Sequence, residues 1–280
     1  MKLIKGNNQV PVIYTAHHAS HDFGEFDDRV ALTQEQKIRF SDYGTDLTVP
    51  VNGLATIISE KSRALGDLNH EPGDAAGFQL YDYNQPNRNE IWKKGLELTL
   101  GEMEYCTEKF YEPFHEAITE QLRNRSELTY VVAWDNTAHY LIGDRYSDER
   151  VMMRPFILSN RGTEGDAQAA PNETVSCDPE FLTSLAKLFS SKLQSYGLPS
   201  EVMCDYVYKG GYICRLYNTR RNKAFLEKKG VKCEVQSLQL EYDASITHDP
   251  ISLAPNLTNI NSIKQAFTEA IIEATSECYI

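Results

Sequence analysis

The sequence predicts a three-layer α/β/α protein, in which a central sheet lies between two layers of helices. Short apolar runs alternate along the chain with longer segments whose apolar residues recur every three or four positions. The chain of 280 residues suits one large domain, and no stretch rich in Pro, Gly and Ser divides it. We therefore expect residues 1–280 to form a single domain.

The strands are predicted from apolar runs, which lie at residues 10–15, 128–134, 156–159 and 235–242. Polar, histidine-rich residues directly follow the first run (VPVIYT), as expected when a buried strand ends in a functional loop. The run LTYVVAW is apolar throughout, which is typical of a central strand covered on both faces. The last run, VQSLQLEY, alternates between apolar and polar residues.

The helices are predicted from helical periodicity, at residues 48–60, 90–125, 178–196 and 261–275. Pro50 and Gly53 interrupt the first of these segments, and Pro113 should kink or break the second. Ser176 or Asp178 can cap the start of the third segment, and Gly197 ends it.

Composition excludes several classes of function. Lys and Arg total 28 against 40 for Asp and Glu, so the net charge of −12 argues against a nucleic-acid partner. No apolar run approaches the roughly 18 residues of a membrane helix, and residues 1–10 do not form a secretory signal. The six cysteines form no CxxC pair, and we expect reduced thiols in a cytoplasmic protein.

Three histidines, His17, His18 and His21, follow the first predicted strand. Imidazole is a common zinc ligand and titrates near neutral pH, so the cluster is either a metal site or a surface loop with chance histidines. Asp135 stands at the end of the most apolar strand, where ligands bind in open α/β sheets. Glu241 lies in an apolar strand and must be either a catalytic base or half of a structural salt bridge.

Taken in chain order, several segments resemble the N-formylglutamate amidohydrolase family. PVIYTAHHAS is similar to the family's strand ending in Pro-His-Ser/Ala-Gly, with His18 as the motif histidine, and DYGTD resembles the acidic turn that follows, with Asp46 as its second carboxylate. The other similar segments are SRALGDLNHEP, YEPFH, RPFILSNRGT, KGGYICRLY and SLQLEY, and together the matches extend over about residues 11–249.

The resemblance implies a fold similar to the zinc carboxypeptidases, with a mixed sheet, and hydrolysis of an amide bond by metal-activated water. By position, the metal ligands would be His18, Asp46 and Asp135, and Glu241 would be the general base. Arg63 would take part in catalysis by polarising the scissile carbonyl or holding a substrate carboxylate. The remaining substrate-binding candidates are Asn69, Arg161, Gly211, Tyr212 and Arg215.

The chain departs from the family pattern at the third metal ligand. The family has a histidine where this chain has Asp135, and a His-Asp-Asp set would bind Zn²⁺, Mn²⁺ or Mg²⁺. His139 is the alternative nitrogen ligand, and loss of metal binding is a third possibility. Differences at His70, Leu216 and Asn218 suggest a substrate other than N-formylglutamate.

Two functions follow from these features. The first is a metal-dependent amidohydrolase acting on a small N-formyl or N-acyl amino acid. This small molecule is the binding partner that we expect. The second is an altered family member that only binds a small molecule. A distance of more than about 6 Å between Asp135 and His18, well beyond coordination distance, would favour the second function.

Overall fold

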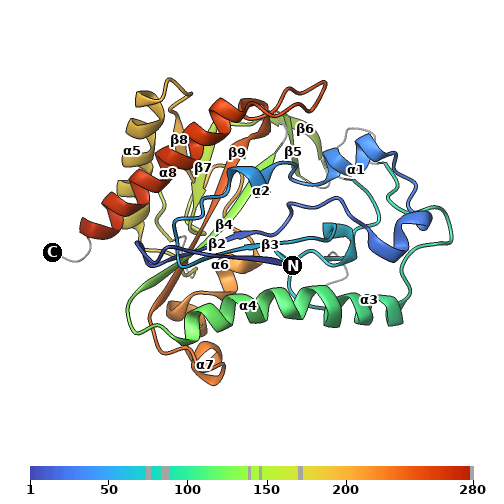
Figure 1. Ribbon diagram of the computed structural model, residues 1–280, viewed down its shortest axis with the longest axis horizontal. Helices are drawn as coiled ribbons and strands as arrows, with labels where there is room; N and C mark the ends of the chain where they lie inside the picture. The colour runs from blue at the N-terminus through green and yellow to red at the C-terminus, as the bar shows by residue number, and fades with distance from the viewer. Residues whose placement is uncertain (74–76, 83–88, 138–139, 145–146, 170–172, 278–280) are drawn as a thin grey trace.

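A seven-stranded mixed sheet forms the centre of the computed structural model (Figure 1). The structure describes residues 1–73, 77–82, 89–137, 140–144, 147–169 and 173–277. In spatial order the strands are β1 (Lys2–Lys5), β3 (Ala55–Ile58), β2 (Val12–Ala16), β4 (Thr129–Thr137), β9 (Val235–Asp243), β7 (Phe156–Ser159) and β8 (Val202–Cys204). A separate hairpin consists of β5 (Tyr140–Asp144) and β6 (Ser147–Met152). All four predicted strands are present.

The strands β2, β4 and β9 are parallel neighbours at the centre of the sheet. Every residue of β2 and β9, and all but the last of β4, is buried. This agrees with the apolar sequences of β2 and β4, whereas β9 also buries its polar residues. β3 is parallel to β2, whereas β1 pairs antiparallel with β3 and β7 pairs antiparallel with β9. The sheet is therefore mixed, and the carboxyl ends of β2, β4 and β9 meet at one edge.

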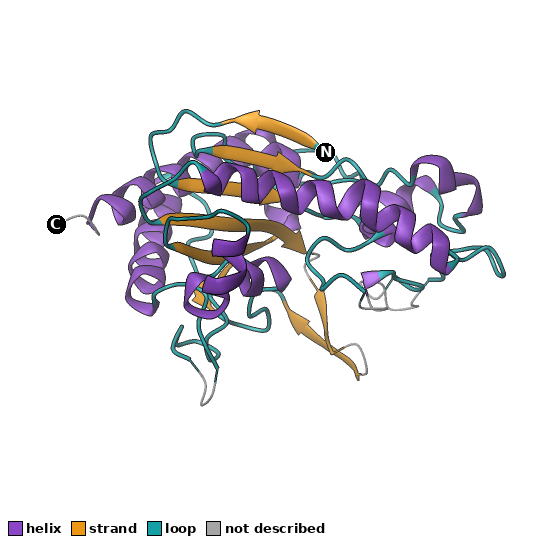
Figure 2. Ribbon diagram, turned by 90° about the horizontal axis from the view of Figure 1, so that it is seen from below, coloured by secondary structure: helices purple, strands orange, loops and turns teal. Residues whose placement is uncertain are grey.

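Helices cover both faces of the sheet (Figure 2). One face, with Tyr14, Trp134 and Leu240, packs against α5 (Pro179–Ser195) and α8 (Leu257–Glu277). The other face, with Ile13 and Val131, packs against α4 (Glu112–Arg123), α6 (Tyr212–Leu216) and α7 (Thr219–Lys228). Successive residues of each strand alternate between these two layers, so the predicted three-layer architecture is confirmed.

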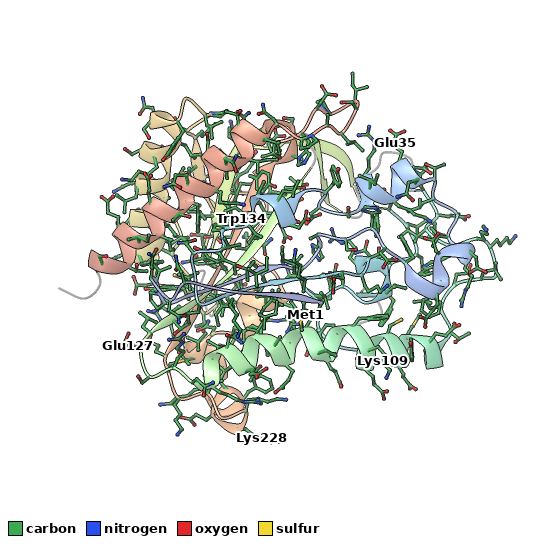
Figure 3. All side chains as sticks on the ribbon, viewed as in Figure 1. Met1, Glu35, Lys109, Glu127, Trp134 and Lys228 are labelled. Carbon is green, nitrogen blue, oxygen red and sulfur yellow. The ribbon has the colours of Figure 1, made fainter. Side chains whose placement is uncertain are left out.

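Trp134 is fully buried and anchors the layer of α8. Its ring meets Phe267 edge-on, with ring centroids 5.0 Å apart, and its Nε1 donates to the hydroxyl of Thr48, at 3.0 Å. In Figure 3 it lies inside the molecule beside α2 (Thr45–Thr48), whereas the labelled Glu35 and Lys228 lie at the periphery.

The prediction of a helix over residues 48–60 is wrong. After α2 ends, the chain enters β3, whose Ala-Thr-Ile-Ile sequence is rich in β-branched residues that favour strands. Gly53 permits the close approach of the two strands, because a Cβ there would lie 2.3 Å from the carbonyl oxygen of Val12.

The helix expected over residues 90–125 begins only at residue 100. It comprises α3 (Leu100–Cys106), a π-helical segment (Thr107–Tyr111) and α4. Pro113 lies in the first turn of α4, directly after the π segment, and the chain stays helical from Leu100 to Arg123, so the helix is not broken at this proline. Residues before Thr99, including Trp92, pack into an apolar cluster without helical structure, so their periodic spacing was misleading.

The helices predicted over residues 178–196 and 261–275 are present as α5 and α8. α5 begins after Asp178, whose side chain accepts from the amides of Glu180 and Phe181, and Gly197 follows with a φ of 71°. The helical elements not yet described are α1 (Gln34–Phe40) and the 3₁₀ turns Gly24–Arg29, Arg63–Leu65 and Ala244–Ile246. Among the described residues, no helix is both long and apolar enough to span a bilayer.

Candidate active site

Polar side chains from three parallel strands gather at the carboxyl edge of the sheet. His17 and His18 directly follow β2, Asp135 lies near the end of β4, and Gln239 and Glu241 lie in β9. Asp135 and Glu241 are direct neighbours in the pairing of β4 with β9. All five side chains are at most 5% exposed.

Two further carboxylates reach this edge from loops. The amide of Asp42, in the loop after α1, donates to the carbonyl of His18 at 3.0 Å and fixes the loop against β2. Asp67 follows the 3₁₀ turn Arg63–Leu65 and Gly66, whose φ of 127° suits a residue without a Cβ. Both aspartates are buried.

The imidazole of His18 has a carboxylate at each nitrogen. Nε2 lies 2.7 Å from Oδ1 of Asp67, and Nδ1 lies 3.2 Å from Oδ2 of Asp42 and 3.4 Å from Oδ1 of Asp135. If Nε2 donates its proton to Asp67, Nδ1 presents a lone pair toward two carboxylates. A carboxylate in this position fixes the tautomer and orientation of a metal-binding histidine.

His17 shares Asp135 with His18. Its Nε2 lies 2.8 Å from Oδ2 of Asp135, but the contact does not have the geometry of a hydrogen bond. Both ring nitrogens of His17 and Oδ1 of Asp135 are buried without a hydrogen-bond partner. Buried polar atoms rarely lack partners, so these atoms suit a ligand that they bind together.

Arg63 lies between the two loop carboxylates. Its Nη1 is 3.3 Å from Oδ1 of Asp42, and its Nη2 is 3.3 Å from Oδ2 of Asp67. Both partners are almost fully buried, and their charges raise the pKa of the guanidinium although burial opposes this. Arg63 thus balances charge within the cluster.

Glu241 is held by Gln239, its neighbour two residues earlier on the same face of β9. Nε2 of Gln239 donates to Oε1 of Glu241 at 2.7 Å and to Oδ2 of Asp135 at 3.3 Å. The second oxygen of Glu241, Oε2, is buried without a hydrogen-bond partner. One oxygen of this carboxylate is therefore fixed, and the other is free to react.

The histidine and its carboxylates shift one another's pKa values. Burial and Arg63 act to lower the pKa of His18, but Asp67, Asp135 and Asp42 raise it well above its usual value. Burial opposes ionisation of Asp67, yet His18 and Arg63 hold its pKa well below the usual range. His18 and Asp67 therefore form an ion pair when no cation is bound.

Asp42 and Glu241 show the opposite shift to Asp67. Burial and the charge of Asp135 raise the pKa of Asp42 to about 6. Burial, Asp135 and Asp42 raise the pKa of Glu241 well above its usual value. Without further positive charge, the negative charges of these residues oppose one another, and a cation bound among them would offset that repulsion.

A divalent cation fits this donor set. His17, His18 and Asp135 offer ligand atoms that all lie within 4.8 Å of one another, and Asp42 adds a carboxylate beside Nδ1 of His18. Imidazole and carboxylate ligands suit Zn²⁺ and Mn²⁺, and the unpartnered atoms of His17 and Asp135 are available to bind. The alternative ligand His139 lies outside the described residues.

The structure does not bring Asp46 into this cluster. Asp46 is exposed in α2, and its charge acts on His248 and Lys264, which are not part of the cluster. Gly44, two residues before Asp46, has a φ of 81° and begins the helical turn in which Asp46 is exposed. Asp42, four residues earlier, lies beside His18 in its place.

The predicted substrate-binding residues are all partly exposed, in contrast to the buried cluster. Asn69 connects to it, because its Oδ1 accepts from the amide of Ile213 and its Nδ2 donates to Gln239 at 3.4 Å. The backbone amide of Gly211 donates to Oε1 of Gln239 at 2.9 Å, and the amide of Tyr212 donates to the carbonyl of Asn69. The segment 210–213 is thus tied to the cluster by backbone contacts.

The two remaining arginines differ in their partners. Arg215 forms an ion pair with Glu71 at 3.1 Å and lies over the ring of Tyr212. Arg161 donates from Nη1 to the carbonyl of Gly210 at 2.9 Å, and no carboxylate among the described residues pairs with it. Arg161 is therefore the better placed of the two to bind an anionic group.

Sequence reasoning assigned no role to Asp67 or Gln239, and it considered His17 only as part of the histidine cluster. The alternation of β9 contained the signal for Gln239, because residues 239 and 241 of a strand face the same side. Asp67 stands in a segment that already resembled the family, but only the fold shows that it meets Nε2 of His18.

Comparisons with known proteins identify the family and the fold. Residues 10–226 match the family model for N-formylglutamate amidohydrolase, whereas no curated protein matches the sequence. The crystal structure of N-formylglutamate amidohydrolase from Ralstonia eutropha JMP134 aligns with a TM-score of 0.66 at 17% identity, covering 99% of this chain and 97% of that one. The gene product Atu2144 from Agrobacterium tumefaciens aligns with a TM-score of 0.61 at 14% identity, covering 100% and 96%. At these identities the two structures show a common fold.

Proposed function

The chain belongs to the N-formylglutamate amidohydrolase family, whose members hydrolyse an amide bond, and from that premise we propose a metal-dependent activity on a small N-formyl or N-acyl amino acid. The observation that carries this proposal is the convergence of unpartnered ligand atoms around His18 and Asp135. In the proposal His18, Asp135 and Asp42 bind the cation, with His17 as an additional nitrogen ligand, and Zn²⁺, Mn²⁺ and Mg²⁺ are the candidates.

When bound, the cation supplies Lewis acidity, which polarises an amide carbonyl and makes water more acidic. Glu241 accepts a proton from water through its free Oε2. The water oxygen bonds to the carbonyl carbon, the carbon–nitrogen bond breaks, and Glu241 passes the proton to the leaving nitrogen. The products are a carboxylic acid, formate for an N-formyl substrate, and an amino acid.

Substrate recognition falls to the partly exposed residues. Arg161 is our candidate for binding the substrate carboxylate, because a guanidinium matches a carboxylate and no acidic side chain among the described residues occupies this one. Asn69, Gly211 and Tyr212 form the adjoining surface. Arg63, which sequence reasoning assigned to catalysis, acts in this proposal by orienting Asp42 and Asp67.

A large separation of Asp135 from His18 would favour the alternative function, a binding module without catalysis. The two groups are only 3.4 Å apart, so this observation favours the enzyme. We retain a cytoplasmic location in the proposal, because the five described cysteines are free thiols.

The first experiment tests metal and activity together. Elemental analysis of the purified protein should find a divalent metal, and hydrolysis of N-formyl and N-acyl amino acids should stop when a chelator removes it. Protein without metal and without chelator-sensitive turnover would contradict the proposal.

A matched pair of variants tests the ligand set. Asp42→Asn should weaken metal binding by roughly 100-fold, since a total binding free energy of about 10 kcal/mol is shared among three or four ligands. Asp46→Asn should bind metal as the wild type does, because Asp46 is exposed outside the cluster. Equal losses in the two variants, or a loss in Asp46→Asn alone, would refute the assignment of Asp42.

A further inference from the structure

The side-chain amide of Gln239 uses all of its hydrogen-bonding capacity inside the site. Its Oε1 accepts from the amide of Gly211 at 2.9 Å and from Nδ2 of Asn69 at 3.4 Å. Its Nε2 donates to Glu241 at 2.7 Å and to Asp135 at 3.3 Å. With two donors and two acceptors satisfied and only 4% of its surface exposed, this side chain has one stable position.

The orientation of the amide follows from its partners. The backbone amide of Gly211 can only donate, so it must face Oε1, and Nε2 must then face the two carboxylates. Rotating the amide by half a turn would place its oxygen against both carboxylates and its NH₂ group against a donor. Both arrangements are unfavourable in a buried site, so the fold fixes the direction in which Gln239 donates.

This direction makes the two oxygens of Glu241 different. Oε1 already receives the N–H of Gln239, whereas Oε2 is buried with no partner. We propose that Gln239 is a positioning residue, which fixes the carboxylates of Glu241 and Asp135 so that Oε2 of Glu241 takes the proton of the reacting water. The inference rests on the proposed function and assigns a role to a residue that does not itself touch the substrate.

The same amide links the two parts of the site. Asn69 and Gly211, which contact its oxygen, belong to the substrate-binding group, whereas Glu241 and Asp135 belong to the buried cluster. The contact at Gly211 is close, because a Cβ there would lie 2.2 Å from the side chain of Asn69. Gln239 therefore sets the distance between the substrate surface and the catalytic carboxylate.

The test replaces Gln239 with methionine, which has a similar length and no hydrogen-bonding amide. Gln239→Met should lower kcat roughly 10- to 100-fold, leave KM within about threefold, and raise the dissociation constant of the metal by roughly 10- to 100-fold, as loss of contacts to metal ligands does. The metal constant is measured with a competing chelator on folded protein and does not depend on turnover.

Gln236→Met is the matched control. Gln236 lies in the same strand and is also 4% exposed, but its side chain bonds to Asp178 and Glu234, outside the site. The control should keep the wild-type kcat and metal affinity even if its melting temperature falls. Equal changes in both variants would show that Gln239 only supports the strand, and would overturn the inference.

A second variant covers the case in which Gln239→Met does not fold. Gln239→Glu keeps the size of the side chain and an acceptor for Gly211, but loses the donor toward Glu241, so the same loss of kcat and metal affinity is expected. Wild-type kcat and metal affinity in either folded variant would overturn this inference but leave the proposed function intact. A wild type that neither binds metal nor hydrolyses any N-acyl amino acid overturns the proposed function, and the inference with it.

Discussion

His115 provides a pH-dependent test of the packing beneath the active site. It lies in α4 and is 8% exposed, with Nε2 3.0 Å from the carbonyl of Leu68 and Nδ1 3.1 Å from the hydroxyl of Tyr217. Leu68 directly follows Asp67, so the imidazole supports the segment that orients His18. Burial lowers the pKa of His115 from 6.5 to about 4.

The magnitude and sign of the effect follow from this shift. Below pH 6.5 the unfolded chain binds a proton at His115, whereas the folded protein binds it only near pH 4. The contribution of His115 to stability is therefore complete above pH 6.5 and is lost as the pH falls toward 4. A shift of about 2.5 pKa units corresponds to about 3 kcal/mol in the free energy of unfolding.

The perturbation is His115→Gln, since an amide does not titrate but can still donate to Leu68. Urea unfolding of both proteins at several pH values from 7.5 to 4 gives the difference between their free energies of unfolding, in which the titration of all other groups cancels. The advantage of the wild type should shrink by about 3 kcal/mol across this range. A difference that stays constant with pH would refute the claim that His115 is neutral in the folded protein.

Two further substitutions test the neighbouring contacts. Gly211→Ala should displace Asn69, destabilise the protein by about 1–3 kcal/mol and lower activity, because the new Cβ would lie 2.2 Å from that side chain; Gly101→Ala, where no atom lies within 4 Å, is the control, and equal melting temperatures would contradict the prediction. Asp67→Asn should weaken metal binding roughly 10- to 100-fold, because its carboxylate orients His18 at 2.7 Å; an unchanged affinity in a chelator competition assay would show that His18 needs no such partner.

The sequence was sufficient for the central strands and the longest helices. The continuous apolar run before Asp135 has few alternatives to a buried strand, and the alternating run around Glu241 also indicates a strand; parallel strands bring their carboxyl ends together. That reasoning alone places His18, Asp135 and Glu241 at one edge. It failed for residues 48–60, where a short apolar segment fits a helix or a strand equally well and pairing with β2 decides the outcome.

The choice between Asp42 and Asp46 could not be made from the sequence. Both stand in the same short acidic turn, and their separation of four residues does not reveal which one faces the sheet. The backbone decides this through Gly44, which has a φ of 81°, and through the hydrogen bond from the amide of Asp42 to His18. Side-chain orientation in a turn depends on such long-range contacts, which periodicity does not encode.

The pairing of β4 with β9 has a consequence for folding of the chain during its synthesis on the ribosome. Asp135 acquires its neighbours Gln239 and Glu241 only from the last quarter of the chain, more than one hundred residues later. A nascent chain that ends before Val235 holds the two histidines and the three aspartates of the site, but it lacks β9, the strand that joins β4 to β7 in the sheet. The active centre is therefore a late product of synthesis, and an amino-terminal fragment contains only part of it.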